Sequence, residues 1–407
     1  MHPLRKYLDR LQPSFSKNGQ FEKYSAIYEM VDNLIYTPST ITQTAPHVRD
    51  GIDLKRVMAF IVMAVLPCIF VGAWNIGFQA NTAMTEMIID SAPGWRGGIL
   101  DFLGVNYNAE NIWDNMMHGL VYVIPVFIVA LVVGWAWEIL FAIIRKRKLS
   151  EGILVISLLF TLTLPPSIPL WQVAIGISFG VVIGKEIFGG TGKNFVNPVL
   201  AGRAFLYFAY PAQIAGDSVW TVVDGFSGAT PLGLGSADGI DNITATGITW
   251  SQAFLGQIQG AIGETSTLAC LLGGIFLVYT GIASWRIIAG GLIGMILTAI
   301  LFNLIGSDSN PMFTIPWYWH LVLGGFAFGI TFLATDPVTS SATNTGRWLY
   351  GLLIGVLIVI IRIANPTIPE CTMFAILLAN IFAPLIDYFV IQLNIIRRRQ
   401  RYAQRQF

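Results

Sequence analysis

Apolar stretches long enough to cross a lipid bilayer recur along most of this chain. A hydrocarbon core about 30 Å thick needs roughly 20 helical residues, because each residue of an α-helix rises about 1.5 Å. Of the 407 residues, 54% are hydrophobic and 12% are charged, about half the charge of an average soluble domain. The sequence therefore predicts an all-α polytopic membrane protein. The basic residues gather at membrane edges, so no nucleic-acid partner is expected.

About ten membrane segments are predicted, and some are interrupted. The residues from 152 to 164 are too few to cross the core, and Pro165-Pro166 stops them from continuing as a helix. The predicted segments are 57–78, 118–144, 152–164, 168–187, 199–215, 266–281, 286–305, 317–334, 348–363 and 372–392.

The distribution of lysine and arginine predicts which side of the membrane each loop faces. With both termini on the inner side, all but Arg96 and Arg362 of the 24 lysine and arginine residues fall on that side, as the positive-inside rule requires. Residues 204–285 contain no lysine or arginine, so the loop within them is predicted to face outward. The polar first fifty-odd residues lack the apolar core of a cleavable signal peptide.

This pattern divides the chain into five regions. A short helix over residues 4–11 is expected in the first of them, either on the membrane surface, on a partner or as a simple cap. The regions are 1–55, an inner N-terminal extension; 56–215, a first membrane repeat; 216–265, an outer loop; 266–395, a second membrane repeat; and 396–407, a basic inner tail.

Two passages look like versions of one another. Each has a short apolar segment, a proline break, a tryptophan, a glycine-spaced span and an Asn-Pro turn: residues 161–198 in the first, and residues 333–366 in the second. The topology makes the first break face outward and the second inward. Paired broken segments of opposite orientation are typical of inverted-repeat folds with a site at the repeat interface. The alternative is proline punctuation that recurs by coincidence.

Charged residues inside or beside the spans are candidate functional residues, because a charge is costly in a membrane. Glu138 lies near the inner end of the second span, Lys185 ends the fourth, Asp336 lies in the second break, and Asp387 lies in the last span. They form an ion path, since hard cations prefer carboxylate and carbonyl oxygens, or simple interhelical pairs. No catalytic residue or bound-metal site is predicted.

Two further features have bland alternatives. Residues 189–194 loosely resemble a phosphate-binding loop but lack the required spacing, and a tight turn at a helix end explains them as well. The cysteines Cys68, Cys270 and Cys371 have no CxxC spacing, so we expect buried thiols rather than a disulfide or a cluster framework.

The segment Asp224-Gly-Phe-Ser-Gly-Ala-Thr230 resembles the D-x-x-[ST]-G-A-[ST] signature at which a flavin transferase links FMN to a hydroxyl through its phosphate. Residues 184–203 and 334–341 also resemble one family. It contains the NqrB component of the sodium-translocating NADH:quinone oxidoreductase and the RnfD component of the Rnf complex. The resemblance covers nearly the whole chain, and the long N-terminal extension favours the first of these two components.

The resemblance implies a urea-transporter-like fold of two inverted five-segment repeats. It also implies covalent FMN on Thr230, noncovalent riboflavin, ubiquinone as substrate and transported sodium. The implied cofactor-binding residues are Asp224, Ser227, Gly228, Ala229, Thr230, Lys193, Asn194, Asn197 and Arg203. The implied quinone and sodium residues are Gly134, Trp135, Glu138, Asp336 and Asp387. Trp135 departs from the family, where a second glycine is expected.

The family further implies the inner membrane of a bacterium, with both termini cytoplasmic and the Thr230 loop periplasmic. It implies five partner subunits, NqrA, NqrC, NqrD, NqrE and NqrF. Two alternatives remain open. One is the Rnf-type component, in which ferredoxin replaces NADH as the upstream donor. The other is a urea-type channel or transporter, which has no use for a flavin-attachment motif.

Overall fold

The computed structural model describes Arg10, Pro13 and residues 54–92, 94–146, 152–365 and 370–405. These residues form helices and connecting turns, with no β-strand among them. Most of the predicted extension 1–55, including the expected helix over 4–11, lies outside the described residues.

The prediction of an all-α polytopic membrane protein is confirmed. Five helices in the described part are long and apolar enough to cross a bilayer: α3, α5, α13, α16 and α17. Every predicted membrane segment coincides with helix. The elements are α3 (Leu54–Met87), α4 (Gly94–Phe102), α5 (Ile112–Arg145), α6 (Gly152–Leu162), α7 (Leu170–Val181), the π-helical turn η2 (Val182–Glu186), α8 (Pro198–Ala209), α9 (Pro211–Ala215), α10 (Pro231–Ala245), α11 (Trp250–Leu255), α12 (Thr267–Tyr279), α13 (Trp285–Ile305), the 3₁₀ turn η3 (Pro311–Thr314), α14 (Trp317–Val322), α15 (Phe326–Phe328), the π-helical turn η4 (Gly329–Leu333), α16 (Asn344–Ala364) and α17 (Thr372–Arg405).

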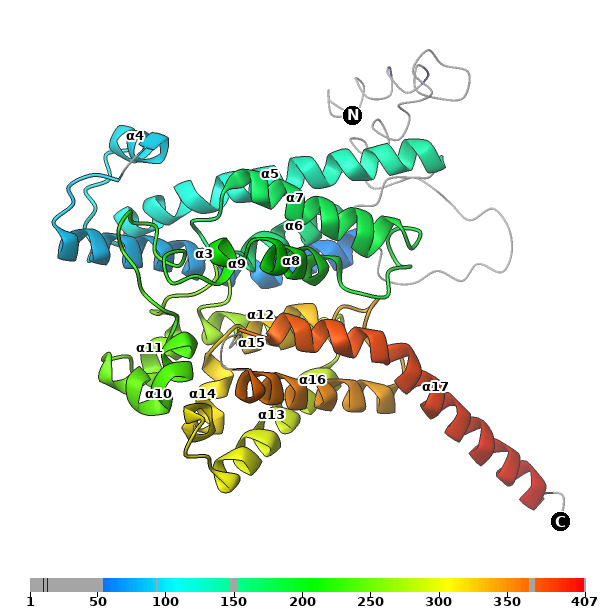
Figure 1. The fold of residues 1–407 in the computed structure, drawn as a ribbon. Coiled ribbons are helices and arrows are strands. Elements are labelled where there is room, and N and C mark those ends of the chain that lie inside the picture. Colours follow the sequence, from blue (N-terminus) through cyan, green and yellow to red (C-terminus); the bar gives the residue numbers. More distant parts are fainter. Residues whose placement is uncertain are drawn as a thin grey trace.

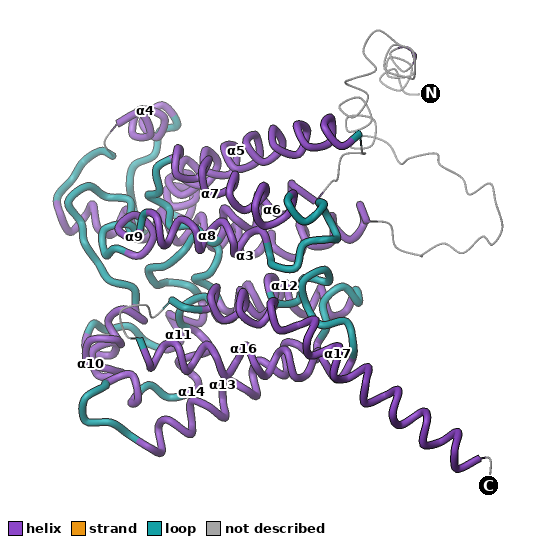
Figure 2. Tube along the Cα trace, turned by 45° about the vertical axis from the view of Figure 1, so that its right-hand side comes forward, coloured by secondary structure: helices purple, strands orange, loops and turns teal. Residues whose placement is uncertain are grey.

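The helices form two bundles that lie one above the other in Figure 1. In the first, α7 packs against both α5 and α8; in the second, α16 packs against both α13 and α17. Helix α12 packs on α3 and joins the bundles. The short helices α10 and α11 lie at the end of the molecule opposite the C-terminus, as Figures 1 and 2 both show. The equivalence of the two bundles as inverted repeats stays a prediction.

The first predicted break is a helix end whose carbonyl groups are satisfied by a distant loop. Helix α6 stops at Leu162, and Pro165 and Pro166 follow without N–H groups to donate. The amide of Gly263 donates to the Leu162 carbonyl at 2.8 Å, and the amide of Ile262 donates to the Leu164 carbonyl at 3.0 Å. Such pairing is what permits irregular backbone to be buried within a membrane protein.

The second bundle has one more interruption than the sequence indicated. The predicted segment 317–334 is divided at residues 323–325, where Gly324 and Gly325 adopt φ of +64° and +65° and glycine is therefore favoured. Arg362, completely buried, donates to the Leu323 carbonyl at 2.8 Å and to the His320 carbonyl at 3.1 Å. Arg362 therefore lies inside the fold and does not count as a loop charge.

The glycine-spaced spans are surfaces of close helix contact. A Cβ atom on Gly351 would lie 2.3 Å from the Ile287 carbonyl oxygen, and one on Gly355 would lie 2.1 Å from that of Gly291. Small residues let α16 and α13 approach to backbone contact, as in other membrane bundles. The three cysteines are free and buried, as predicted.

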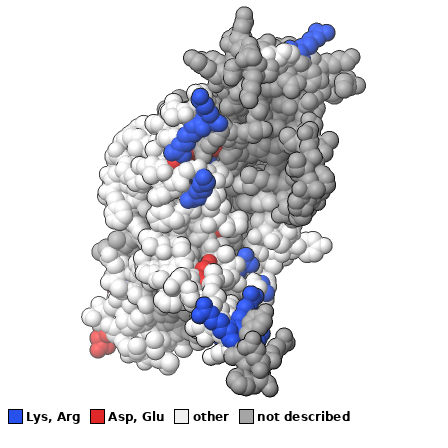
Figure 3. Space-filling model, turned by 90° about the vertical axis from the view of Figure 1, so that its right-hand side faces the viewer, with Lys and Arg blue, Asp and Glu red and all other residues white. Residues whose placement is uncertain are grey.

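Lysine and arginine gather on one end of the molecule. Figure 3 shows this end, which faces right in Figure 1, where both termini lie. Helices α10 and α11 are at the other end. This separation is the one that the loop charges predicted for the two sides of a membrane.

Candidate functional site

Thr230 caps the N-terminus of α10. Its backbone is extended (φ −62°, ψ 154°), and its Oγ1 accepts a hydrogen bond from the Gly233 amide at 3.2 Å, as the side chain of an N-cap threonine does. Pro231 takes the first helical position, where its missing N–H removes no helical bond. The start of the helix therefore holds the threonine hydroxyl in one place.

The predicted flavin-attachment motif forms a turn with an exposed rim and a buried end. Asp224 and Ser227 are exposed, whereas Thr230 is 6% exposed. When the Gln259 amide is oriented to suit its neighbours, its nitrogen donates to the carbonyls of Gly228 at 2.8 Å and Ala229 at 3.0 Å. The loop before α12 thus holds the end of the motif against the body of the protein.

Three charged side chains from distant parts of the sequence lie beneath Thr230. Arg203 of α8 approaches Glu264 at 2.5 Å and Glu370 at 3.9 Å, and all three side chains are at most 18% exposed. The Thr230 hydroxyl hydrogen-bonds to the Glu370 carboxylate. Burial raises the pKa of Glu370 to about 7, an effect that Arg203 partly opposes and Glu264 reinforces.

Glu264 and Glu370 were not among the residues predicted from the sequence. Each lies in a short connection between predicted spans, where an acidic residue drew no attention. The sparsity of charge around them was the available signal, since charges near membrane segments need a partner. Arg203, predicted to contact a cofactor and counted on the inner side, lies buried in an ion pair near Thr230 instead.

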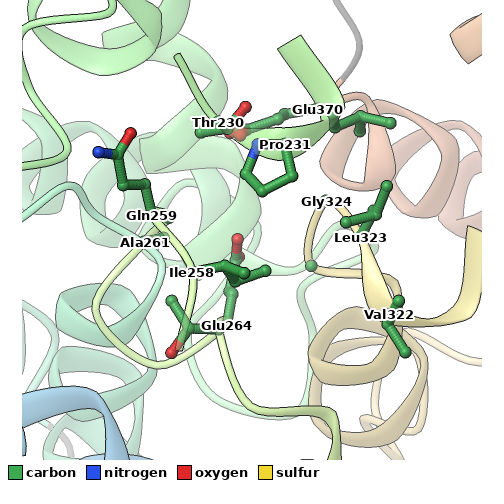
Figure 4. Close-up of a pocket in the computed structure, with 14 residues that line it drawn as sticks. Thr230, Pro231, Ile258, Gln259, Ala261, Glu264, Val322, Leu323, Gly324 and Glu370 are labelled. Carbon is green, nitrogen blue, oxygen red and sulfur yellow. The ribbon is translucent and has the colours of Figure 1, made fainter. Parts of the chain in front are cut away.

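A cavity of about 20 Å³ lies beside Thr230 and is lined by Gln259, Glu264, Leu323 and Glu370, among others. Figure 4 shows that its walls come from the start of α10, the loop before α12, the break at 323–325 and the connection into α17. This volume holds about one water molecule and excludes a flavin ring.

A larger, polar cavity of about 460 Å³ opens between α4 and the segment that precedes the motif. Its walls include Trp95, Arg96, Tyr122, Thr221 and Asp224. Asp224 is the first residue of the motif, so this cavity adjoins the exposed rim of the turn.

A third cavity, of about 300 Å³, has mostly apolar walls from α3, α6 and α12. Its polar groups come from Lys185, Asn194, Asn197, Thr335 and Asp336. Asn197 donates to the Leu333 carbonyl at 3.4 Å, so both bundles contribute to this site.

Among the predicted residues, Asn194, Asn197 and Asp336 therefore meet at one cavity. Lys193 is exposed and is not part of its wall. Glu138 reaches the same place through Lys185, with which it forms a buried ion pair at 3.0 Å.

Gly134 and Trp135 lie one helical turn before Glu138 on α5. A Cβ atom on Gly134 would lie 2.9 Å from Ile153 Cδ1 of α6, so glycine permits the close contact between these helices. Trp135 is half-buried.

Asp387 lies apart from these groups. Its carboxylate accepts four hydrogen bonds: from the Ser341 and Thr343 hydroxyls at 2.6 Å, the Ala342 amide at 2.7 Å and the Thr343 amide at 3.0 Å. These bonds fix the turn before α16. Asp336 accepts from the Val338 amide at 3.2 Å and the Thr339 hydroxyl at 3.0 Å.

Residues 41–395 match the model of the NQR2, RnfD, RnfE family. The chain is 56% identical over 400 residues to proteins named as the NqrB component of Na(+)-translocating NADH-quinone reductase from Ectopseudomonas mendocina and Azotobacter vinelandii, with 98% of this chain and 99% of each relative covered. A protein of the same name from Klebsiella pneumoniae is 54% identical over 410 residues, with the same coverage.

Proposed function

Because this chain belongs to the NQR2, RnfD, RnfE family, we propose that it is the NqrB component of a sodium-translocating NADH:quinone reductase. In that role it carries FMN esterified to Thr230 and a noncovalent riboflavin, and it contributes to ubiquinone reduction and sodium translocation. The observation that carries this proposal is the 56% identity, over nearly the full length, with proteins of that name.

The surroundings of Thr230 suit a phosphoester. The Gly233 amide needs only a lone pair on Oγ1, which an ester oxygen retains. The Arg203 guanidinium lies in the neighbouring cluster, where it offsets the negative charge of a phosphodiester. The rest of a tethered FMN would lie toward the exposed rim at Ser227, since the cavity on the buried side holds about one water molecule.

The residues of this chain would position the FMN, whose ring supplies the redox chemistry. Thr230 fixes the phosphate, Arg203 balances its charge, and Gln259 holds the turn closed over the anchor. Attachment requires that the transferase reach a hydroxyl that is 6% exposed in the closed turn. We therefore infer that the turn opens, or has not yet packed, when FMN is attached.

The cavity of about 300 Å³ is our candidate for riboflavin. Its volume falls at the lower end of the range of small-molecule sites, and apolar walls with few polar groups are typical of them. Asn194, Asn197 and Asp336 supply donors and acceptors for the polar edge of the ring, while Val155 and Leu159 contact its faces.

For the quinone and sodium steps, the same end of the molecule is favoured. The Glu138–Lys185 pair borders the riboflavin candidate site, and Gly134 and Trp135 lie on the same helix as Glu138. Sodium entry would follow from a change in local charge when a flavin is reduced. The four hydrogen bonds to Asp387 support a role in holding a turn rather than in binding an ion directly.

We place the protein in the inner membrane of a bacterium, with its termini in the cytoplasm and Thr230 on the periplasmic side. The gathering of basic residues at the end that carries the termini supports this orientation. The partners would be NqrA, NqrC, NqrD, NqrE and NqrF of the same complex. Rnf proteins share the family model, but the full-length relatives named as NqrB favour the sodium pump.

The proposal is tested by the mass of the intact chain, purified after expression with a flavin transferase. One covalent FMN gives a fixed mass increment and a fluorescent band on a denaturing gel. Thr230→Ala should abolish both, whereas Thr230→Ser should retain them because the transferase accepts either hydroxyl. A wild-type chain with the mass of its amino acids alone would refute the proposal.

A further inference from the structure

The polar cavity of about 460 Å³ beside the motif has no role in the function proposed so far. It lies between α4, the N-terminal half of α5 and the segment 218–224. Its volume is within the range of ligand sites, about 300–1,000 Å³. It is more than twenty times larger than the cavity on the buried side of Thr230.

The walls carry groups that recognise a flat, electron-poor ring. Trp95 is 56% exposed, and Tyr122 is 5% exposed. The Arg96 guanidinium lies 4.3 Å from the centre of the Tyr122 ring and 5.1 Å from that of Trp95. Arg96 Nε is buried and has no hydrogen-bond partner among the described residues. A buried donor of this kind needs an acceptor, such as a ring carbonyl or ring nitrogen.

One side chain separates this cavity from the flavin-bearing turn. The Thr221 hydroxyl, in the cavity wall, donates to the Gln259 oxygen at 3.3 Å, and the Gln259 nitrogen donates to the Ala229 carbonyl at 3.0 Å. Ala229 is the residue before Thr230. The ribityl chain of a tethered FMN is longer than one amide side chain, so the ring can reach the cavity from Thr230.

We propose that this cavity holds the isoalloxazine ring of the FMN tethered to Thr230, with Trp95 and Tyr122 against the ring and Arg96 at its polar edge. This inference rests on the proposed function, because it requires the phosphoester at Thr230. It assigns to α4 and to Arg96, the one basic residue of the predicted outer loops that remains outside the membrane bundles, the task of positioning the ring.

The arrangement has a consequence for redox behaviour. A fixed positive charge beside a flavin favours its negatively charged reduced form. Arg96 should therefore raise the midpoint potential of this FMN. Tyrosine and tryptophan in contact with a flavin also quench its fluorescence by electron donation, which phenylalanine does not do.

The test compares native and denatured fluorescence of the full-length chain, expressed with the transferase. Trp95→Phe and Tyr122→Phe preserve ring volume and remove the electron donor. We expect a several-fold rise in native covalent-flavin fluorescence, after subtraction of the Thr230→Ala signal, with an unchanged band on a denaturing gel. Trp113→Phe, at a tryptophan that is 60% exposed at the start of α5, is the matched control and should change neither. Arg96→Gln should shift the midpoint potential to more negative values.

Flavin attachment and ring placement fail separately in this test. An absent denatured band in the wild type would overturn the attachment at Thr230 itself. A normal band with unchanged native fluorescence in both aromatic variants, and an unchanged potential in Arg96→Gln, would leave the attachment standing and overturn the ring site.

Discussion

Lys185 Nζ lies 3.1 Å from one carboxylate oxygen of Glu138 and 3.0 Å from the other, and both side chains are 1% exposed. Glu138 comes from α5 and Lys185 from the turn η2 that follows α7, so the pair joins two membrane segments. Removing two charges from water costs several kcal/mol for each ion, and their attraction offsets this cost only while both are present. Lys185 also lines the cavity of about 300 Å³.

We therefore expect Glu138→Leu to destabilise the protein by about 3–5 kcal/mol, since it leaves the Lys185 charge buried without its partner. The double variant Glu138→Leu with Lys185→Leu should recover most of this loss. Denaturant unfolding in detergent, analysed as a double-mutant cycle, measures both. Glu110→Leu, at an exposed acid, is the control. Additive effects of the two single changes would contradict a buried pair.

Asp387 should behave as a structural anchor for the turn before α16. Asp387→Asn keeps the oxygen that accepts from Ser341 and Thr343 and loses the acceptor of the Ala342 amide. We expect a loss of about 1–3 kcal/mol, with a larger loss in Asp387→Ala, and faster proteolysis of the turn. Asp308→Asn, at an exposed site, should be neutral. Unchanged stability of Asp387→Asn, with loss of sodium dependence in the complex, would instead make Asp387 an ion ligand.

Much of the helical layout could be predicted from the sequence because span length, proline position and loop charge act locally. The end of α6 before Pro165 is an example. The break at 323–325 escaped notice because its stability depends on Arg362, nearly forty residues away, which satisfies the exposed carbonyls. A glycine pair inside an apolar segment does not by itself distinguish a close helix contact from a break.

The candidate site divides in the same way. The motif ending at Thr230 is contiguous, so the sequence identifies it. Glu264 and Glu370 are brought to Thr230 by the packing of α8, the loop before α12 and the start of α17, and no spacing in the sequence encodes that meeting. Arg203 was selected by resemblance, but its partner Glu264 was invisible without the fold.

Filling the apolar cavity should displace noncovalent flavin alone. Leu159 lines this cavity and is 6% exposed; in Leu159→Trp the indole would occupy the space proposed for riboflavin. We expect loss of acid-extractable flavin from the purified chain and full retention of the covalent band on a denaturing gel. Leu272→Trp, at an exposed position of α12, is the control. Because overpacking itself costs about 1–3 kcal/mol, unfolding is measured in parallel. Normal extractable flavin in a folded variant would exclude this cavity.

Arg362 should be among the residues least tolerant of substitution. Its guanidinium is completely buried and donates to the carbonyls of His320, Leu323 and Gly324. Arg362→Met leaves these acceptors unpaired and should destabilise the protein by more than about 3 kcal/mol. Arg362→Lys should recover only part of the loss, because an ammonium lacks the planar fork that spans several carbonyls. Arg398→Met, at an exposed position, is the control, and equal stability of wild type and Arg362→Lys in denaturant unfolding would contradict this role.

The stability of the chain without FMN should fall as the pH rises toward neutrality, because of Glu370. Burial raises the pKa of this carboxyl from 4.5 to about 7, against Arg203 and Arg362 and with the help of Glu264. Between these two values the folded chain holds a proton that the unfolded chain has released. The stabilisation is therefore complete below about pH 4.5 and is lost as the pH passes 7.

The expected loss is no more than about 3 kcal/mol, since one pKa unit corresponds to about 1.4 kcal/mol. The measurement is the unfolding free energy at pH 5 and pH 8, for chain produced without a flavin transferase so that Thr230 keeps its hydroxyl. Glu370→Gln stays neutral at both values, and the difference between the two pH values should shrink in this variant by the contribution of Glu370. Glu110→Gln, at an exposed acid, should retain the wild-type difference. If Glu370→Gln showed the same pH dependence as the wild type, the Glu370 carboxyl would be ionised in the folded chain well below neutrality, and its place beside Thr230 would be that of a permanent anion.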